Sequence, residues 1–292
     1  METVKKYVES KKPNLSKSSI VTYSSILKNL YKRVFGDGEI DMLKFNEPDK
    51  VLDFLKNVPS NKRKTILSSL VIITDKKPYR DLMLDDVREY NKEIHKQEKT
   101  QEQKDNWVET TQVKERLNEL KENADLIYKK KQLTITDLQE IQSYIIMCLL
   151  GGIYISPRRS KDYVDFKIKS IDKEKDNFLD KNKMYFNSYK TSKTYGLQVV
   201  DIPIQLKNIL QKWIKINPTD YLLFDSNMNK ISSVKLNQRL NKIFDKKVGV
   251  NQLRHTFLTD KFSHTIKEKD EIKETMQEMG SSSNMLTTYV KK

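Results

Sequence analysis

The chain lacks several features that mark whole classes of protein. Its 292 residues include one cysteine, Cys148, which excludes an internal disulfide framework and a zinc site built from cysteines. No run of about 18 apolar residues is present, and the most apolar stretch, residues 145–155, is too short to cross a bilayer. Residues 1–6 lack the apolar core of a signal peptide. We therefore expect an intracellular protein with no membrane-spanning segment.

Positive charge is the feature present in excess. The 55 Lys and Arg residues against 40 Asp and Glu residues leave a net charge of +15. Residues 1–100 carry +6 of this excess, from 21 basic and 15 acidic side chains, and the remaining residues carry +9. A basic surface attracts polyanions, most commonly nucleic acid, although lysine-rich proteins of AT-rich genomes have a similar charge. Two basic lobes would bind a DNA duplex from both sides, in a strongly salt-dependent way.

The first hundred residues have the spacing of short helices. Ser16 is suited to cap a helix whose apolar residues recur every three or four positions. A later helix begins with the basic run Lys62-Arg63-Lys64. Such a run is either a solvated first turn or, in a DNA-binding helical domain, a contact with phosphates. Residues 1–105 are therefore predicted to form an all-helical domain.

A polar, highly charged stretch over residues 81–131 separates the two halves of the chain. It predicts either a long solvated helix or a linker, so the domain boundary is placed within it, between residues 105 and 106. Beyond the boundary, Thr136 matches the start of a capping box with Gln139. This box predicts a helix that ends at Gly151 and Gly152.

Three strand-like runs follow that helix, at residues 163–168, 184–189 and 197–202. The last two flank a polar turn, 190–196, which is typical of a hairpin. Helical patterns then return at residues 206–214, 234–244, 253–262 and 272–279. Residues 106–292 are therefore predicted to be mainly helical with a small antiparallel sheet.

The last forty residues combine Arg254, at a predicted helix start, with Tyr289 near the C-terminus. Cutting DNA without a metal requires arginine forks that neutralise the phosphate oxygens. It also requires an acid for the leaving 5′-oxygen and a nucleophile that conserves the bond in a covalent link. A tyrosine hydroxyl suits the last task.

These residues resemble the catalytic motifs of the tyrosine recombinases. Leu253-Arg254-His255-Thr256-Phe257 is similar to the family's core motif residue for residue, and Tyr289 lies where the family has its nucleophile. The resemblance covers most of the chain. It implies an α+β fold with an N-terminal all-helical core-binding domain, residues 1–105, and a catalytic domain, residues 106–292.

The first catalytic arginine implied by the resemblance lies in the pair Arg158-Arg159. In the family an acidic residue follows this arginine by three positions, and Asp162 fits that place for Arg159. Arg159 is therefore assigned to catalysis and Arg158 to the DNA backbone, although adjacent arginines after a proline are often a surface pair. The catalytic lysine belongs in the predicted hairpin, where Lys190 fits best and Lys193 is the alternative; either could equally be an exposed turn residue.

Two positions depart from the family pattern. Asn251 stands where the family has His or Lys, and Ser281 stands where it has His or Trp. Both can donate hydrogen bonds, but neither can act as a base near neutral pH. These two candidate site residues therefore imply either slower chemistry or an active site that is completed differently.

The resemblance implies a site-specific recombinase or integrase that needs no metal or other cofactor, acts on double-stranded DNA and assembles as a homotetramer. A mobile element or large DNA virus is the expected source, with the protein located wherever that DNA resides. Two alternatives remain: a catalytically degenerate DNA-binding protein of the same fold, and an enzyme that relaxes DNA as type IB topoisomerases do.

Overall fold

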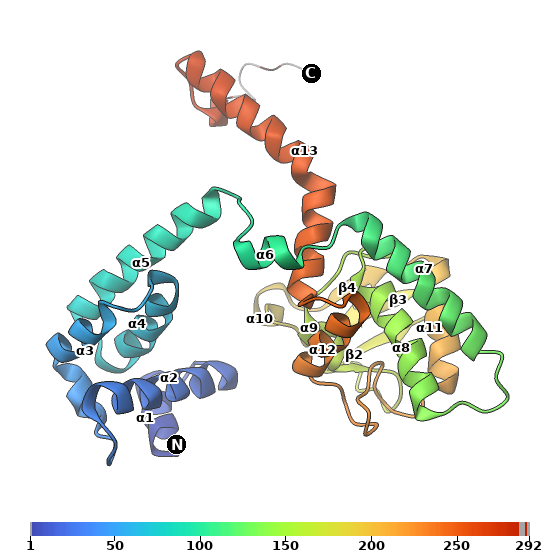
Figure 1. Cartoon of the computed structure of the whole chain (residues 1–292), viewed down its shortest axis with the longest axis horizontal. Coiled ribbons are helices and arrows are strands. Elements are labelled where there is room, and N and C mark those ends of the chain that lie inside the picture. Colours follow the sequence, from blue (N-terminus) through green and yellow to red (C-terminus); the bar gives the residue numbers. More distant parts are fainter. Residues whose placement is uncertain (1, 286–289, 291–292) are drawn as a thin grey trace. The chain divides into compact units, whose positions relative to one another are not determined.

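A computed structural model describes residues 2–285 and residue 290. The chain forms two compact units, Met1–Lys99 and Thr100–Lys292. The predicted boundary after residue 105 falls inside the short helix α6 (Gln101–Asn106) (Figure 1). Within the described residues, the search for an apolar helix of bilayer-spanning length found none.

All the regular elements among the described residues of the first unit are helices, as the sequence predicts. Ser16 accepts a hydrogen bond from the backbone N–H of Ser19 at 3.1 Å, and α2 starts at the next residue after this cap. Tyr79 is fully buried and donates its hydroxyl to the carbonyl of Phe45 at 3.0 Å, which joins the last helix to the middle of the core. The elements are α1 (Glu2–Lys11), α2 (Lys17–Phe35), η1 (Met42–Asn46), α3 (Pro48–Leu55), α4 (Ser60–Thr74) and α5 (Lys77–His95).

The second unit combines helices with one small sheet, which confirms the predicted α+β class. Its helices are α6, α7 (Thr110–Ile127), α8 (Ile135–Leu150), α9 (Ser160–Val164), α10 (Ser192–Tyr195), α11 (Ile204–Ile216), α12 (Ser233–Phe244), α13 (Val250–Glu278) and η2 (Ser283–Met285). Its strands are β1 (Phe166–Lys167), β2 (Asn177–Asp180), β3 (Lys183–Phe186) and β4 (Gln198–Asp201).

The sheet has the order β1-β2-β3-β4 and is mixed. β3 and β4 form the predicted antiparallel hairpin, with Tyr185 opposite Val199. β1 pairs with β2 in parallel, so the sheet is not wholly antiparallel as predicted. The parallel pairing arises because the chain between the two strands crosses back to the end of the sheet where β1 began before it enters β2. Of the predicted strand 163–168, only Phe166 and Lys167 form a strand, whereas Tyr163 and Val164 are buried on α9.

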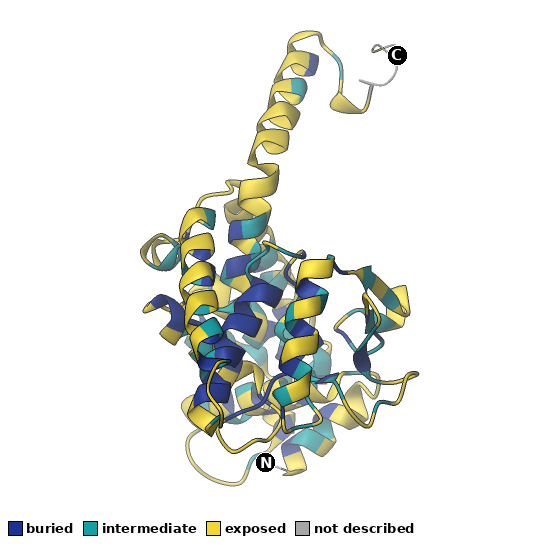
Figure 2. Ribbon diagram, turned by 90° about the vertical axis from the view of Figure 1, so that its right-hand side faces the viewer, coloured by how far each residue is buried: buried dark blue, intermediate teal, exposed yellow. Residues whose placement is uncertain are grey.

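Helix α8 is the centre of the second unit. All of its residues from Asp137 to Leu150 are buried except Glu140, and Figure 2 shows this helix as a dark-blue rod inside the unit. Its cap is Thr134 and not the predicted Thr136: Asp137 donates its N–H to Thr134 Oγ1 at 3.1 Å, and Thr134 donates its N–H to the Asp137 carboxylate at 2.9 Å. Because α8 is buried on nearly every side, its C-terminal end is fixed in place, and it positions the residues that follow Leu150.

The lowered pKa of the Asp137 carboxyl indicates that the protein loses stability in acid. Lys130 and Thr134 donate hydrogen bonds to it and lower its pKa from 3.8 to about 2. A carboxyl whose pKa is depressed on folding stabilises the protein above its unfolded pKa and loses that effect as the pH falls. We therefore expect Asp137→Asn to lower the denaturation midpoint at pH 7, with the difference from wild type shrinking between pH 3.8 and about 2. Thr134→Ser, which keeps the capping hydroxyl, is the control; a difference that does not depend on pH would contradict the prediction.

Helix α13 joins into one helix two stretches that the sequence predicts separately, 253–262 and 272–279. It has 29 residues, and Val250, Leu253 and Thr256 in its first turns are buried. Residues 258–271 are exposed, as the yellow outer turns in Figure 2 show. Only the beginning of α13 therefore packs into the core of the second unit.

Candidate active site

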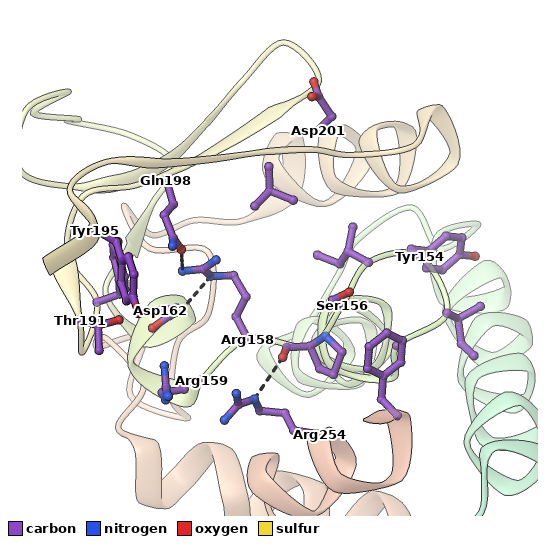
Figure 3. Close-up of a pocket in the computed structure, with 17 residues that line it drawn as sticks. Tyr154, Ser156, Arg158, Arg159, Asp162, Thr191, Tyr195, Gln198, Asp201 and Arg254 are labelled. Atoms are coloured by element: carbon purple, nitrogen blue, oxygen red, sulfur yellow. Dashed lines mark hydrogen bonds and ion pairs between the residues drawn. The ribbon is translucent and has the colours of Figure 1, made fainter. Parts of the chain in front are cut away.

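A hollow of about 850 Å³ opens in the second unit. Three segments line it: the loop 152–159 that follows α8, the hairpin of β3 and β4, and the first turns of α13 (Figure 3). Arg158, Arg159 and Arg254 all contribute to the lining, so the structure brings together the arginines of both sequence motifs.

Three hydrogen bonds hold the helix that carries Arg254. Val250 donates its N–H to Asn237 Oδ1 at 3.0 Å, which satisfies one of the unpaired amides at the start of α13. Thr256 Oγ1 donates to the carbonyl of Val108 at 2.7 Å. Arg254 Nε itself donates to the carbonyl of Pro157 at 3.2 Å (Figure 3). The guanidinium is therefore oriented by the same loop that carries Arg159.

Gly152 brings that loop against α13. Its backbone has φ +74°, and a Cβ added there would lie 2.5 Å from Cδ2 of Phe257. Only glycine combines this left-handed conformation with so close an approach. Leu253 is buried and Phe257 packs over Gly152, so the apolar neighbours of Arg254 both anchor its helix.

The two adjacent arginines point in different directions. Arg159 immediately precedes α9, and its side chain is exposed on the wall of the hollow. Arg158 is turned inward, with 18% of its side chain exposed. It donates to Asp162 Oδ2 and to Gln198 Oε1, each at 2.8 Å. Figure 3 shows both bonds, which occupy Arg158 within the protein.

The hollow carries a surplus of positive charge. Burial raises the pKa of the Asp162 carboxyl, while Arg158, Arg159 and Arg254 oppose that shift. Burial also lowers the pKa of Arg254, as does the nearby charge of Arg159. Asp162 forms its ion pair with Arg158, and within residues 2–285 neither Arg159 nor Arg254 has a carboxylate partner. Two guanidinium groups beside one hollow suit an anion with several oxygens.

The two candidate lysines lie in the hairpin loop. Lys190 and Lys193 are both exposed, and neither belongs to the wall of the hollow. Their neighbours Thr191 and Tyr195 do line it. The loop is closed by the Tyr189 hydroxyl, which donates to the carbonyl of Gly196 at 2.7 Å. The lysines are therefore at the edge of the hollow, and the choice between them stays a prediction.

Two predicted residues of the C-terminal motifs, Asn251 and Ser281, are not gathered at the hollow. Asn251 is exposed on the first turn of α13, outside the lining. Ser281 follows the far end of α13, after a helical path of roughly 36 Å from Arg254 to Glu278 at 1.5 Å per residue. Tyr289 lies outside the described residues. The catalytic roles of these residues stay predictions.

The basic run of the first unit has mixed surroundings. Lys62 is exposed. Arg63 donates to both oxygens of the buried Asp86, at 2.9 and 2.6 Å, and ties α4 to α5. Lys64 lies over the ring of Tyr90. A DNA contact by Arg63 would have to compete with its ion pair, because unpairing Asp86 would leave a buried charge.

Two parts of the site have no local signal in the sequence. In the sequence Gln198 is an ordinary polar residue, and only the folded hairpin places it beside Arg158. Tyr195 is one of 14 tyrosines, and only the short helix α10 places it at the hollow. Within the described residues, no group of three or more His, Cys, Asp or Glu side chains could hold a metal ion.

No family model matches the chain, and no curated protein matches it. Solved structures that are similar to it share little of its sequence. A lambda integrase dimer bound to a COC′ core site has a TM-score of 0.45 and 13% identity, over 88% of this chain and 68% of that chain. The XerA recombinase has a TM-score of 0.35 and 14% identity, over 89% of this chain and 83% of that chain.

Proposed function

We propose that this protein is a tyrosine recombinase that cuts and rejoins double-stranded DNA without a metal or other cofactor. The observation that carries the proposal is the hollow in which Arg159 and Arg254 meet without carboxylate partners among the described residues. The motifs around these arginines are far apart in the sequence, and their meeting at one hollow is what a phosphate-binding site requires. The net charge of +15 supplies the general attraction to DNA.

In the proposed reaction, Arg159 and Arg254 bind the non-bridging oxygens of the scissile phosphate and neutralise the charge that gathers in the transition state. The Tyr289 oxygen forms a bond to phosphorus, and the bond to the 5′-oxygen breaks. Lys190, or Lys193 in its place, gives a proton to that oxygen. The proton of the tyrosine hydroxyl passes to water, because Asn251 and Ser281 do not titrate near neutral pH. The 3′-phosphotyrosyl link keeps the bond energy for rejoining.

Recombination of two DNA sites needs four such cuts. We therefore propose a homotetramer assembled on DNA, in which each chain contributes one site. The contacts of Lys62, Lys64 and Lys193 with the DNA backbone, and an origin in a mobile element or virus, belong to the same proposal.

The proposal is tested with DNA that carries a nick near candidate sites from the source element's ends. Because the nick traps the cut state, wild-type protein is expected to give a protein–DNA band that resists SDS and EDTA. Tyr289→Phe is expected to give none, while Tyr195→Phe, which changes one of the tyrosines that line the hollow, still gives the band. A band that survives in Tyr289→Phe but disappears in Tyr195→Phe would refute the assignment of the nucleophile.

A degenerate DNA-binding protein is the second candidate, favoured by Asn251 and Ser281 in place of titratable side chains. Site-specific protection of DNA from nuclease, without any covalent band, would select it. A topoisomerase-like enzyme would instead relax supercoiled DNA as a single chain without regard to site.

A further inference from the structure

Arg158 makes contacts of two kinds, hydrogen bonds and cation–π contacts. Its Nε donates to Asp162 Oδ2 and its Nη2 donates to Gln198 Oε1, both at 2.8 Å. Its guanidinium carbon lies 4.0 Å from the centre of the Phe186 ring, within the range of a cation–π contact. The guanidinium is therefore hydrogen-bonded at two of its nitrogens, as Figure 3 shows, and also lies near the rings of Phe186 and Tyr189.

The contacts of Arg158 with the hairpin lie at the end of the β3–β4 pairing, next to the loop. Phe186 is the last residue of β3, Gln198 is the first residue of β4, and the two are register partners. They form the final rung of the ladder before the loop 187–197 begins. Asp162 belongs to α9, which Arg159 precedes. Arg158 thus joins the root of the loop to the segment that holds Arg159.

The surroundings of Arg158 oppose a role as a ligand of DNA phosphate. Its partner Asp162 has 3% of its side chain exposed, and the other oxygen of this carboxylate accepts no hydrogen bond from the described residues. If Arg158 turned toward a phosphate, Asp162 would become a buried charge without a counter-charge. Arg159 is exposed at the same hollow and pairs with no buried carboxylate among the described residues.

We propose that Arg158 is a positioning residue that fixes the root of the loop 187–197 and thereby keeps its lysines at the edge of the hollow. Arg159 and Arg254 bind the phosphate, and Arg158 does not. This division replaces the sequence-based prediction that Arg158 contacts the DNA backbone. The consequence for catalysis rests on the proposed function, whereas the anchoring of the loop does not.

The chemical reason is the short reach of a proton transfer. A general acid must come within hydrogen-bond distance of the leaving oxygen, and such an acid contributes about 100- to 10,000-fold to a rate. Lys190 and Lys193 sit on a loop whose strand pairing ends at Phe186 and Gln198. Releasing that rung lets the loop move, and the lysine then spends less time in reach.

The test compares Arg158→Met with wild type and with Arg159→Met as the matched control, which removes the same charge from the neighbouring exposed position. Limited trypsin digestion of the free proteins, with fragments mapped by mass spectrometry, reports the loop through cleavage at Lys190 and Lys193. We expect at least about a tenfold faster cleavage at these two lysines in Arg158→Met and no change in Arg159→Met, because opening of the anchored loop limits cleavage.

Two further measurements separate positioning from phosphate binding. The dependence of DNA affinity on salt is expected to be unchanged in Arg158→Met, whereas Arg159→Met loses about 0.9 of slope, the value of one phosphate contact. The rate of adduct formation in Arg158→Met is expected to fall about 100-fold on ordinary DNA. That rate should recover on DNA with sulfur as the bridging 5′-atom, because a thiolate, with a thiol pKa of roughly 8.5, leaves without a proton.

If Arg158→Met does not fold, Gln198→Leu keeps the ion pair with Asp162 and removes only the acceptor on the hairpin side. If Arg158→Met folds, unchanged trypsin cleavage together with a loss of salt slope in this same variant would overturn the proposal and make Arg158 a DNA ligand. Absence of any adduct from the wild-type protein on either DNA would instead sink the proposed function, and the trypsin result would still decide whether Arg158 anchors the loop.

Discussion

Replacing Arg254 by alanine is expected to slow covalent adduct formation by about 100- to 1,000-fold, the usual effect of removing one transition-state donor. Arg254 is held at the hollow through its Nε bond to Pro157, and its remaining N–H groups have no carboxylate partner among residues 2–285. Arg254→Lys keeps the charge but loses the planar fork, so we expect an intermediate rate. The measurement is the rate of the SDS-resistant band on nicked DNA.

The loss of Arg254 should affect chemistry far more than folding. One hydrogen bond to Pro157 contributes on the order of 1 kcal/mol, so the melting temperature should change by only a few degrees. Arg116→Ala is the matched control, since it removes an arginine charge from the same unit at a half-buried position outside the hollow. An Arg254→Ala protein that forms adducts at the wild-type rate would show that Arg254 is not a phosphate ligand.

The second large effect is expected at Gly152. An alanine there would adopt φ +74° with its Cβ 2.5 Å from the Phe257 ring. The left-handed conformation costs about 1–3 kcal/mol in a residue other than glycine. Overpacking against a fixed ring costs about 1–3 kcal/mol more. Because Phe257 follows Arg254 by one turn, relief of the clash moves the helix start and with it the guanidinium.

Gly152→Ala is therefore expected to lower both the free energy of unfolding and the rate of adduct formation, by about tenfold or more for a displacement near 1 Å. Gly36→Ala is the matched control, because Gly36 has φ +90° and no atom within 4 Å of an added Cβ. It should lose stability through its backbone alone and keep its activity. Equal losses of stability in both variants, with activity unchanged in Gly152→Ala, would show that the contact with Phe257 does not position the site.

Sequence patterns were sufficient where the signal was local. Ser16 caps its helix as predicted, and the polar turn between residues 184–189 and 197–202 marks the β3–β4 hairpin. A cap or a hairpin depends on residues a few positions apart, so its pattern is visible in the chain. The predicted cap Thr136 was wrong, because Thr134, two residues earlier, forms the capping box with Asp137. The two threonines are the same residue type, and only the path of the turn before the helix decides which one is the cap.

Long-range decisions were not visible in the chain. β1 pairs in parallel with β2, and α13 continues as one helix through stretches that the sequence predicts separately. Tyr163 lies in a stretch that the sequence predicts as a strand, yet it is fully buried on α9 and packs edge-on against Phe186. Packing against a distant segment overrides the local preference of so short a stretch.

By itself, the sequence determined the α+β class, the surplus of positive charge and the identities of Arg159 and Arg254 as candidates, because composition and short motifs are properties of the chain. Only the tertiary structure decided how the adjacent arginines differ. Arg158 and Arg159 are indistinguishable as residue types, and the partners that separate them, Asp162 and Gln198, include one that lies 40 positions away. An arginine paired with a buried carboxylate is part of the framework, and an arginine without one at the same hollow is available to an anion.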